Sequence, residues 1–229
     1  MRITEIVNDE ILTEVRQEAN LVSKFKDVEE YEGNINMAGH YITSLRGAPR
    51  IVNGNFNVEN NPLLKSLRFA PVHIHGNFNA SKCDIQTLRG CTTKTVGGKF
   101  CINENSFKST ADLIGAPEDI AELDIAYKLG FDSLSGINKA FKSINQKIFI
   151  SPSATHVLGL LLIRNLKKIV IGRTENSRAS QSNEAMNLAK VVKILNTHLA
   201  TGEVDMLEAK AEIIETYSGN AEILALAKS

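Results

Sequence analysis

The chain has 229 residues, and its 26 basic and 26 acidic side chains leave a formal net charge of zero at neutral pH. This balance provides no net field to attract nucleic acid or an anionic membrane surface, although a local charged patch remains compatible with it. No stretch approaches the ~18 apolar residues of a transmembrane helix, and residues 1–20 lack the apolar core of a signal peptide. The composition therefore favours a soluble, cytoplasmic protein without nucleic-acid or membrane partners.

The N-terminal stretch, from residue 1 to about residue 28, places apolar side chains such as Ile3, Ile6 and Val7 at helical spacing. This spacing predicts an amphipathic helix. A helix in front of a repeat array can cover the apolar edge of the first coil, so we assign residues 1–30 to an N-terminal helical cap. The alternative interpretation is a helix that binds a partner.

From residue 31 the sequence repeats itself with a period of roughly 22 residues, the kind of period found in solenoid proteins. The repeats carry two apolar residues separated by one polar residue, which is typical of a short strand with one buried face. Each coil is therefore expected to give about one strand to a parallel sheet. The first apolar residues, at steps of 21, 22, 22, 23, 25 and 21, are Ile35, Phe56, Phe78, Phe100, Leu123, Ile148 and Ile169.

Glycines and turn residues recur with the strands. Gly33, Gly54, Gly76 and Gly98 each stand two residues before the first apolar strand position. A side chain there would crowd the neighbouring coil, or a positive φ is required. Buried leucines followed by Gly or Pro, as in Leu45-Arg-Gly-Ala-Pro, end the return segment of each coil.

The leucine-rich-repeat pattern Leu-x-Leu-x-x-Asn/Cys-x-Leu fits three consecutive coils. The matching segments are Phe56-x-Val58-x-x-Asn61-x-Leu63, Phe78-x-Ala80-x-x-Cys83-x-Ile85 and Phe100-x-Ile102-x-x-Asn105-x-Phe107. With the Gly-Asn-Phe and Ser-Leu-x-Gly-Ala-Pro motifs, residues 31–172 resemble the leucine-rich-repeat-like proteins of bacteriophages and some bacteria. The pattern departs from the family where other residues replace the Asn, at His40, Lys128, Ser153 and Thr174.

The resemblance implies an α/β fold: a solenoid of about seven coils with a short-strand parallel sheet. It also implies that Asn61, Cys83 and Asn105 are structural, because buried turn amides and carbonyls need partners there.

After the array, polar residues 173–182 predict a linker. The pattern then becomes helical. Asn183 can cap a helix that Gly202 ends, a second helix ends near Gly219, and a third short helix follows. We assign residues 183–229 to a C-terminal helical cap or subdomain.

No catalytic or metal-binding pattern stands out. Cys83, Cys91 and Cys101 lack the paired spacing of a zinc site, with or without His73 and His75, and their odd number argues against a disulfide framework. No nucleophile elbow, phosphate loop or paired carboxylate motif is present. We therefore expect no cofactor, no metal and no enzymatic activity. An enzyme whose site is assembled across coils is the third-ranked hypothesis.

The residues between the buried strand positions are expected to form one row on an open sheet face: Asn36, Asn57, Asn79, Cys101, Asp124, Phe149 and Val170. A second row lies two residues earlier: Asn34, Asn55, Asn77, Lys99, Glu122, Lys147 and Lys168. One interpretation is a structural asparagine ladder. The other is a recognition surface, since solenoids bind partners through such sheets. The candidate partner-binding residues are Asn57, Asn79, Cys101, Asp124, Lys147 and Phe149.

The favoured hypothesis is non-catalytic protein–protein recognition. The family resemblance suggests a phage accessory protein that binds and modulates a host protein, for example as an inhibitor of a host defence protein. The alternative is a self-assembling homo-oligomer with the C-terminal helices as its interface.

Overall fold

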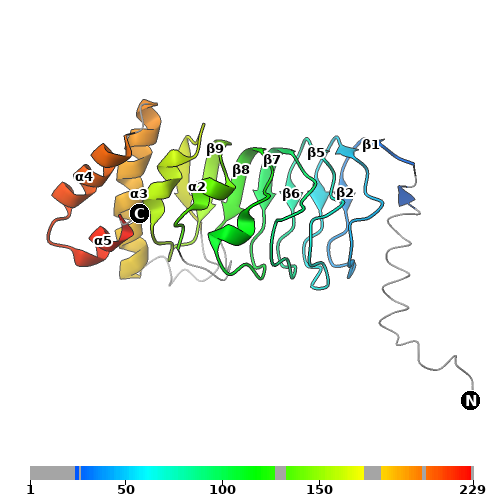
Figure 1. Cartoon of the computed structure of the whole chain (residues 1–229), viewed down its shortest axis with the longest axis horizontal. Coiled ribbons are helices and arrows are strands. Elements are labelled where there is room, and N and C mark those ends of the chain that lie inside the picture. Colours follow the sequence, from blue (N-terminus) through cyan, green and yellow to red (C-terminus); the bar gives the residue numbers. More distant parts are fainter. Residues whose placement is uncertain (1–23, 26, 127–132, 173–181, 203–204, 228–229) are drawn as a thin grey trace, which may run out of the picture.

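The computed structural model describes residues 24–25, 27–126, 133–172, 182–202 and 205–227. The predicted N-terminal helix therefore lies largely outside the described residues, as does nearly all of the predicted linker. The described chain winds into an elongated parallel β-solenoid, and three helices follow at its C-terminal end (Figure 1). The predicted mixed α/β solenoid is confirmed at this level.

Parallel strand segments align along the solenoid in two rows. The segments are β1 Glu30–Tyr31, β2 Ile35–Asn36, β3 Ile51–Val52, β4 Phe56–Asn57, β5 His73–Ile74, β6 Phe78–Asn79, β7 Thr95–Cys101, β8 Asp119–Ile125, β9 Ile144–Ile150 and β10 Lys168–Ile171. The inner row consists of β1, β3, β5 and the first residues of β7, β8 and β9. The outer row consists of β2, β4, β6, the last residues of β7, β8 and β9, and β10.

The outer row has the register expected from the sequence. Ile35 pairs with Phe56, and the same alignment continues coil by coil to Ile169. Six steps join the first of these segments to the last, so the described chain makes about six turns where about seven coils were expected. The early coils are nearly equal in length because each must bring its own pair of apolar strand residues to the equivalent place in the core.

The inner row was not expected, because only one strand per coil was predicted. Its buried residues also stack in register, from Val52 through Ile74 and Val96 to Ile120. In the early coils a short Asn-Gly-Asn or His-Gly-Asn corner separates the two segments, and in β7, β8 and β9 one bent strand spans both. The corner is tight because glycine lets neighbouring coils approach. A Cβ added to Gly76 would lie 2.7 Å from the carbonyl oxygen of Gly54.

The core is a continuous stack of apolar side chains along the solenoid axis. Phe56, Phe78 and Phe100 are fully buried, and their ring centroids are 5.5 and 5.2 Å apart. Each ring therefore packs on equivalent residues of the coils before and after it, as expected for a repeat that cannot bury its apolar face by itself.

The buried turn residues bond neighbouring coils together. Asn61 donates to the carbonyls of Met37 (2.9 Å) and Val58 (2.7 Å) and accepts from the amide of Ile42 (3.1 Å). Asn105 repeats this arrangement one coil beyond Cys83, whose thiol donates to the carbonyl of Val58 at 3.3 Å. The structural role expected for these three residues is confirmed. The histidine at the equivalent first position, His40, is exposed and bonds to the carbonyl of Ala38.

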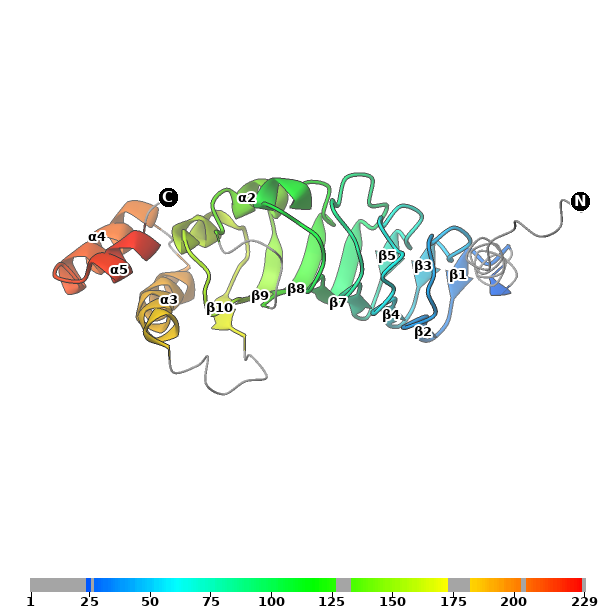
Figure 2. The same cartoon turned by 90° about the horizontal axis from the view of Figure 1, so that it is seen from below.

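Helical turns lie on the side away from the outer row. Figure 2 shows α2, Ile137–Ala140, on the upper side and β2, β4 and β10 on the lower side. Two 3-10 turns, η2 Thr110–Leu113 and η3 Val157–Leu162, belong to the return segments of the longer coils.

The C-terminal helices are α3 Asn183–Thr201, α4 Met206–Thr216 and α5 Ala221–Leu226. Ser182, and not Asn183, caps α3 by accepting from the amide of Ala185, and Gly202 follows the helix with φ 75°, as expected of a glycine stop. No helix in the described ranges combines the length and apolar character that crossing a membrane requires.

Candidate partner-binding surface

The two polar rows predicted on the outer face are present and in register. Asn57 aligns with Asn79, Asn79 with Cys101, Cys101 with Asp124, and Asp124 with Phe149. Lys147 belongs to the parallel row that also holds Lys99, Glu122 and Lys168. The structure thus places all six candidate residues on one face, although their surroundings differ.

The asparagine-rich half is occupied by structural hydrogen bonds. The Oδ1 atoms of Asn34 and Asn55 accept from the backbone amides of Asn55 and Asn77, each at 2.7 Å. In the neighbouring row Asn57 and Asn79 accept from amides two residues later, at 3.0 and 3.1 Å. The Asn34 and Asn55 carbonyls therefore link successive coils as a ladder, whereas those of Asn57 and Asn79 bond within their own turns.

Glu59 ties the same half together. Asn79 donates to one of its carboxylate oxygens at 3.0 Å, and Lys82 lies 3.0 Å from the other. Asn57 and Asn79 therefore lie among neutral asparagines that bond the backbone, with the Glu59–Lys82 ion pair beside them. The other four candidates lie further along the solenoid, among charged side chains.

The charged half is a compact cluster around Phe149. The Nζ atom of Lys99 lies 4.0 Å from the Phe149 ring centroid, and 3.9 and 4.0 Å from the carboxylates of Asp124 and Glu122. Lys147 lies 3.0 Å from Glu122 on the opposite side. Phe149 is half-buried because of this cover, whereas an exposed ring was expected.

Asp124 is held from several sides. Its Oδ1 atom accepts from the side-chain amide of Asn103 (3.0 Å) and the backbone amide of Ala126 (3.1 Å). Its other oxygen, Oδ2, lies 3.9 Å from the Lys99 Nζ atom that covers the Phe149 ring. A positioned charge next to an aromatic ring is a common element of protein recognition sites.

Cys101 lies in the same row, but it is unsuited to nucleophilic chemistry. Burial, reinforced by the nearby Asp124 carboxylate, raises the pKa of its thiol to about 12. The thiolate, which is the reactive form, is then scarce at neutral pH. Burial also raises the pKa of Cys83, to about 11, and that of Cys91.

A groove continues the outer face beyond Phe149. Val170, its register neighbour, lines a groove of about 630 Å³ between β10 and α3, with Ala189, Val192 and Lys193 on the helix side. The ion pairs among the described residues do not include Lys168 or Lys193, which are exposed at this groove. We call Cys101, Asp124, Lys147, Phe149 and Val170 together with this groove the outer surface.

Sequence reasoning did not find the groove or the role of Lys99. The groove depends on how α3 docks, which no strand period encodes. The role of Lys99 could have been inferred, because Lys99, Glu122 and Lys147 alternate in sign at equivalent positions, and opposite charges at paired strand positions attract.

No group of three or more His, Cys, Asp or Glu side chains within the described ranges is arranged to hold a metal ion. Comparison of the chain with protein-family models, curated proteins and solved structures gives no match.

Proposed function

We propose that this protein is a non-catalytic recognition module that binds another protein through the outer surface. The single observation that carries the proposal is the Phe149 ring. The Lys99 ammonium group covers the ring, and Val170, the register neighbour of Phe149 in the next strand, lines an open groove. A partly exposed aromatic ring with a polar rim is the arrangement of an interface hot spot.

The charges at the groove define the partner further. Lys168 and Lys193 are exposed without ion pairs among the described residues, while Asp124 and Glu122 are already paired with lysines. The partner segment that complements this surface carries an apolar side chain for the groove and acidic side chains for the two lysines.

The resemblance of residues 31–172 to leucine-rich-repeat-like proteins supports the recognition role, because the turn ladder of Asn61, Cys83 and Asn105 behaves as that pattern implies. The same resemblance is the basis for proposing a host protein as the partner of a phage accessory protein.

The test is affinity capture with matched variants. Wild-type protein is expected to retain a partner from a lysate of the cells in which it functions. The Phe149→Ser/Asp124→Lys variant is expected to lose it while remaining folded by circular dichroism, with a lower thermal midpoint because the bonds of Asp124 to Asn103 and Ala126 are lost. Asn36→Ser, which alters the asparagine half of the same row, is the control and should bind normally. Equal capture by the wild-type protein and the double variant would move the interface away from the outer surface.

Self-association through the C-terminal helices is the second candidate, and one observation favours it. Met186 on α3 and Leu207 and Ile214 on α4 are 47%, 75% and 46% exposed. Packing these side chains against a second copy of the chain would remove their apolar surface from water. Sedimentation equilibrium distinguishes the candidates, because a Leu207→Glu/Ile214→Glu variant would dissociate an oligomer built on these helices and leave a monomer unchanged.

A further inference from the structure

Phe69 occupies a turn position that is glycine in the equivalent turns of three other coils. Four coils end their return segment at Gly47, Phe69, Gly90 and Gly115, with φ values of 89°, 66°, 81° and 103°. Three of the four are glycine, the residue that adopts positive φ without strain. A bulky aromatic residue there is a conformational outlier, and such outliers cluster at functional sites.

The Phe69 ring is also exposed to solvent, at a position where the equivalent turns have no side chain. It is 40% exposed, and the guanidinium carbons of Arg46 and Arg68 lie 4.6 and 5.6 Å from its centroid. It borders a groove of about 710 Å³ whose other lining includes Val28 and Pro49. The strained turn therefore presents a ring at a groove of mixed lining, in which Asp27, Glu29 and Arg50 accompany the apolar residues.

Arginines extend from the ring along the solenoid. Arg46, Arg68 and Arg89 occupy equivalent positions in successive coils, and each donates its amide N–H to the hydroxyl of a Ser or Thr two residues earlier, at 3.1, 3.1 and 3.2 Å. The backbone at these three positions is therefore alike. We call Arg46, Arg68, Phe69 and Arg89 the arginine stripe.

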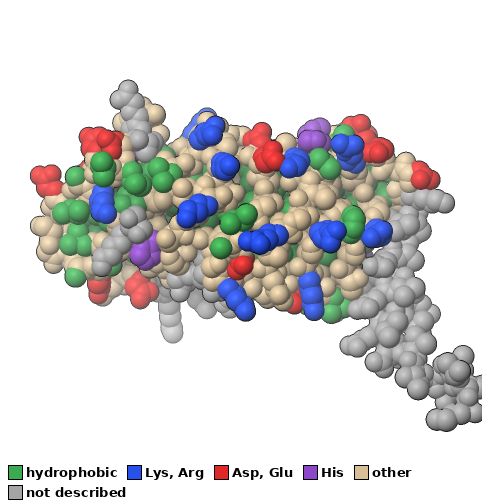
Figure 3. Space-filling view, in the orientation of Figure 1, with side chains coloured by type: hydrophobic (Ala, Val, Ile, Leu, Met, Phe, Trp, Pro, Cys, Tyr) green, Lys and Arg blue, Asp and Glu red, His purple; other side chains and the backbone are tan. Residues whose placement is uncertain are grey.

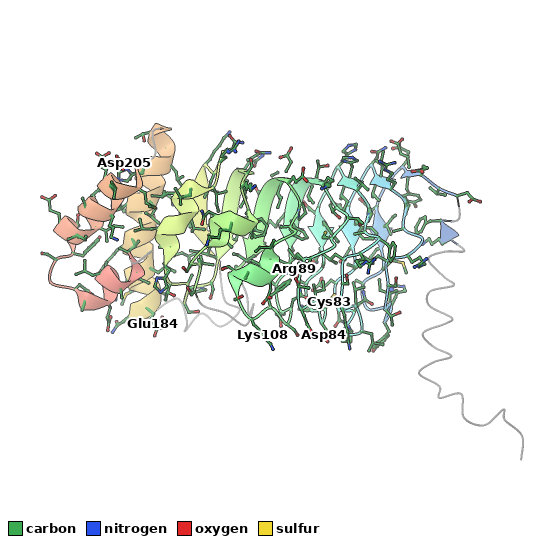
Figure 4. All side chains as sticks on the ribbon, in the orientation of Figure 1. Cys83, Asp84, Arg89, Lys108, Glu184 and Asp205 are labelled. Carbon is green, nitrogen blue, oxygen red and sulfur yellow. The ribbon has the colours of Figure 1, made fainter. Side chains whose placement is uncertain are left out.

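The stripe is not neutralised by its surroundings. All three arginines are exposed, and none of them takes part in the ion pairs found among the described residues. The nearby carboxylate of Asp112 instead accepts from the amides of Lys108 and Ser109. Figure 3 shows Lys and Arg side chains in a row along this face, and Figure 4 labels Arg89 within it.

We propose that the arginine stripe and its groove bind an acidic segment of a partner protein. Carboxylates of the segment would pair with the guanidinium groups, which match carboxylate geometry in a bidentate manner. An apolar side chain of the segment would enter the groove beside Phe69. Arg89 follows Leu88, whose amide donates to the carbonyl of Asp112 in η2, and η2 packs against α2. Figure 2 shows α2 on the side opposite β2, β4 and β10, so this inference is independent of the outer surface.

The groove favours a peptide over a nucleic acid. Asp27 and Glu29 are exposed at its edge and would repel a nucleic acid, which is charged at every phosphate. A peptide can instead place its carboxylates at the arginines and an uncharged residue beside Asp27 and Glu29. Arg46 already lies over the Phe69 ring, where a base would have to stack.

Phe69→Gly is the decisive variant, because it removes the ring and relieves the strained backbone together. It is expected to keep or raise the thermal midpoint and to lose binding. Arg46→Glu/Arg89→Glu reverses the charge of the stripe, and Arg164→Glu is the control at an exposed arginine outside it.

The experiment selects peptides from a displayed random library on immobilised full-length protein, then measures the affinity of the enriched peptides for each variant. We expect enriched peptides with net negative charge and at least one large apolar residue. They should bind Phe69→Gly and Arg46→Glu/Arg89→Glu at least tenfold more weakly and Arg164→Glu normally.

Several results would overturn the proposal: no enrichment, enriched peptides without acidic residues, or equal affinity for the stripe variants. A fall in the thermal midpoint of Phe69→Gly would make the ring structural. Tighter stripe-dependent binding of single-stranded oligothymidine than of any peptide would assign the stripe to nucleic acid.

Discussion

Asn196 of α3 bonds to both backbone groups of Ile169 in the last strand, accepting from its amide at 2.8 Å and donating to its carbonyl at 3.0 Å. These are the two bonds that a strand of a further coil would make. One side chain thus stands in for the next coil at the otherwise unpaired edge of β10.

Asn196→Ala should therefore loosen α3 from the solenoid. It leaves a part-buried amide and carbonyl without their side-chain partner, and each lost hydrogen bond costs about 0.5–1.5 kcal/mol. We expect a lower free energy of unfolding in denaturant titrations and faster hydrogen exchange at the Ile169 amide. Thr197→Ala, at the exposed neighbouring position, is the control. Unchanged exchange at Ile169 would show that the edge is protected by other contacts.

Phe78→Ala should destabilise the whole array. The ring is fully buried between Phe56 and Phe100, and a buried Phe→Ala change costs about 3–5 kcal/mol. Phe78→Leu keeps most of the volume and should cost less. Thermal unfolding followed by circular dichroism tests this, and a midpoint unchanged by the alanine would contradict the stacked core.

Gly76→Ala should destabilise the corner between the two strand rows. A Cβ there would lie 2.5 Å from the Asn55 Oδ1 atom and 2.7 Å from the carbonyl oxygen of Gly54, so the coils would have to separate. Gly219→Ala is the matched control, because a Cβ at Gly219 meets nothing within 4 Å. Equal thermal midpoints for the two variants would mean that the corner has room that the structure does not show.

Stability should fall as the pH rises above the ordinary range of thiol ionisation. In the folded chain the pKa values of Cys83 and Cys101 are raised from 9.0 to about 11 and about 12. Above pH ~9 the thiols of the unfolded chain ionise while those of the folded chain stay protonated, which lowers the free energy of the unfolded state. The free energy of unfolding is therefore unaffected by these thiols below pH 9 and falls as the pH rises towards 11–12.

Denaturant titrations of wild-type protein and of Cys83→Ala/Cys101→Ala measure the effect. The double variant should lose less stability than the wild type between pH 8 and 11. Parallel curves would indicate that burial does not suppress ionisation of these thiols.

Much of the outer row could be predicted from the sequence because its signal is local and periodic. Phe56, Phe78 and Phe100 recur at a fixed step, and the parallel pairing follows the same step. The structural role of Asn61 could also be predicted, because a buried polar side chain at a turn has few alternatives to bonding the backbone.

Other features depended on contacts that no period reveals. The inner row was missed because its apolar positions are single residues such as Val52 and Ile74 among polar neighbours. The contact of the Lys99 ammonium group with the Phe149 ring joins two rows and two different coils, so the charge alternation within one row does not reveal it. The sequence aligns Phe69 with Gly47, Gly90 and Gly115, but only the structure shows that Phe69 keeps the positive φ of those glycines.

The side chains that link neighbouring coils on the outer face change along the solenoid from neutral asparagines to charged residues. Before Lys99, neighbouring coils are joined by Asn34, Asn55 and Asn77, whose amide carbonyls accept from backbone amides. After it, Lys99, Glu122 and Lys147 join the coils by charge. Dissolved ions screen partly exposed charges and leave neutral hydrogen bonds nearly untouched. Raised ionic strength should therefore weaken the Lys99–Glu122–Lys147 links more than the asparagine links, while the backbone pairing of β7, β8 and β9 holds the coils together in both cases.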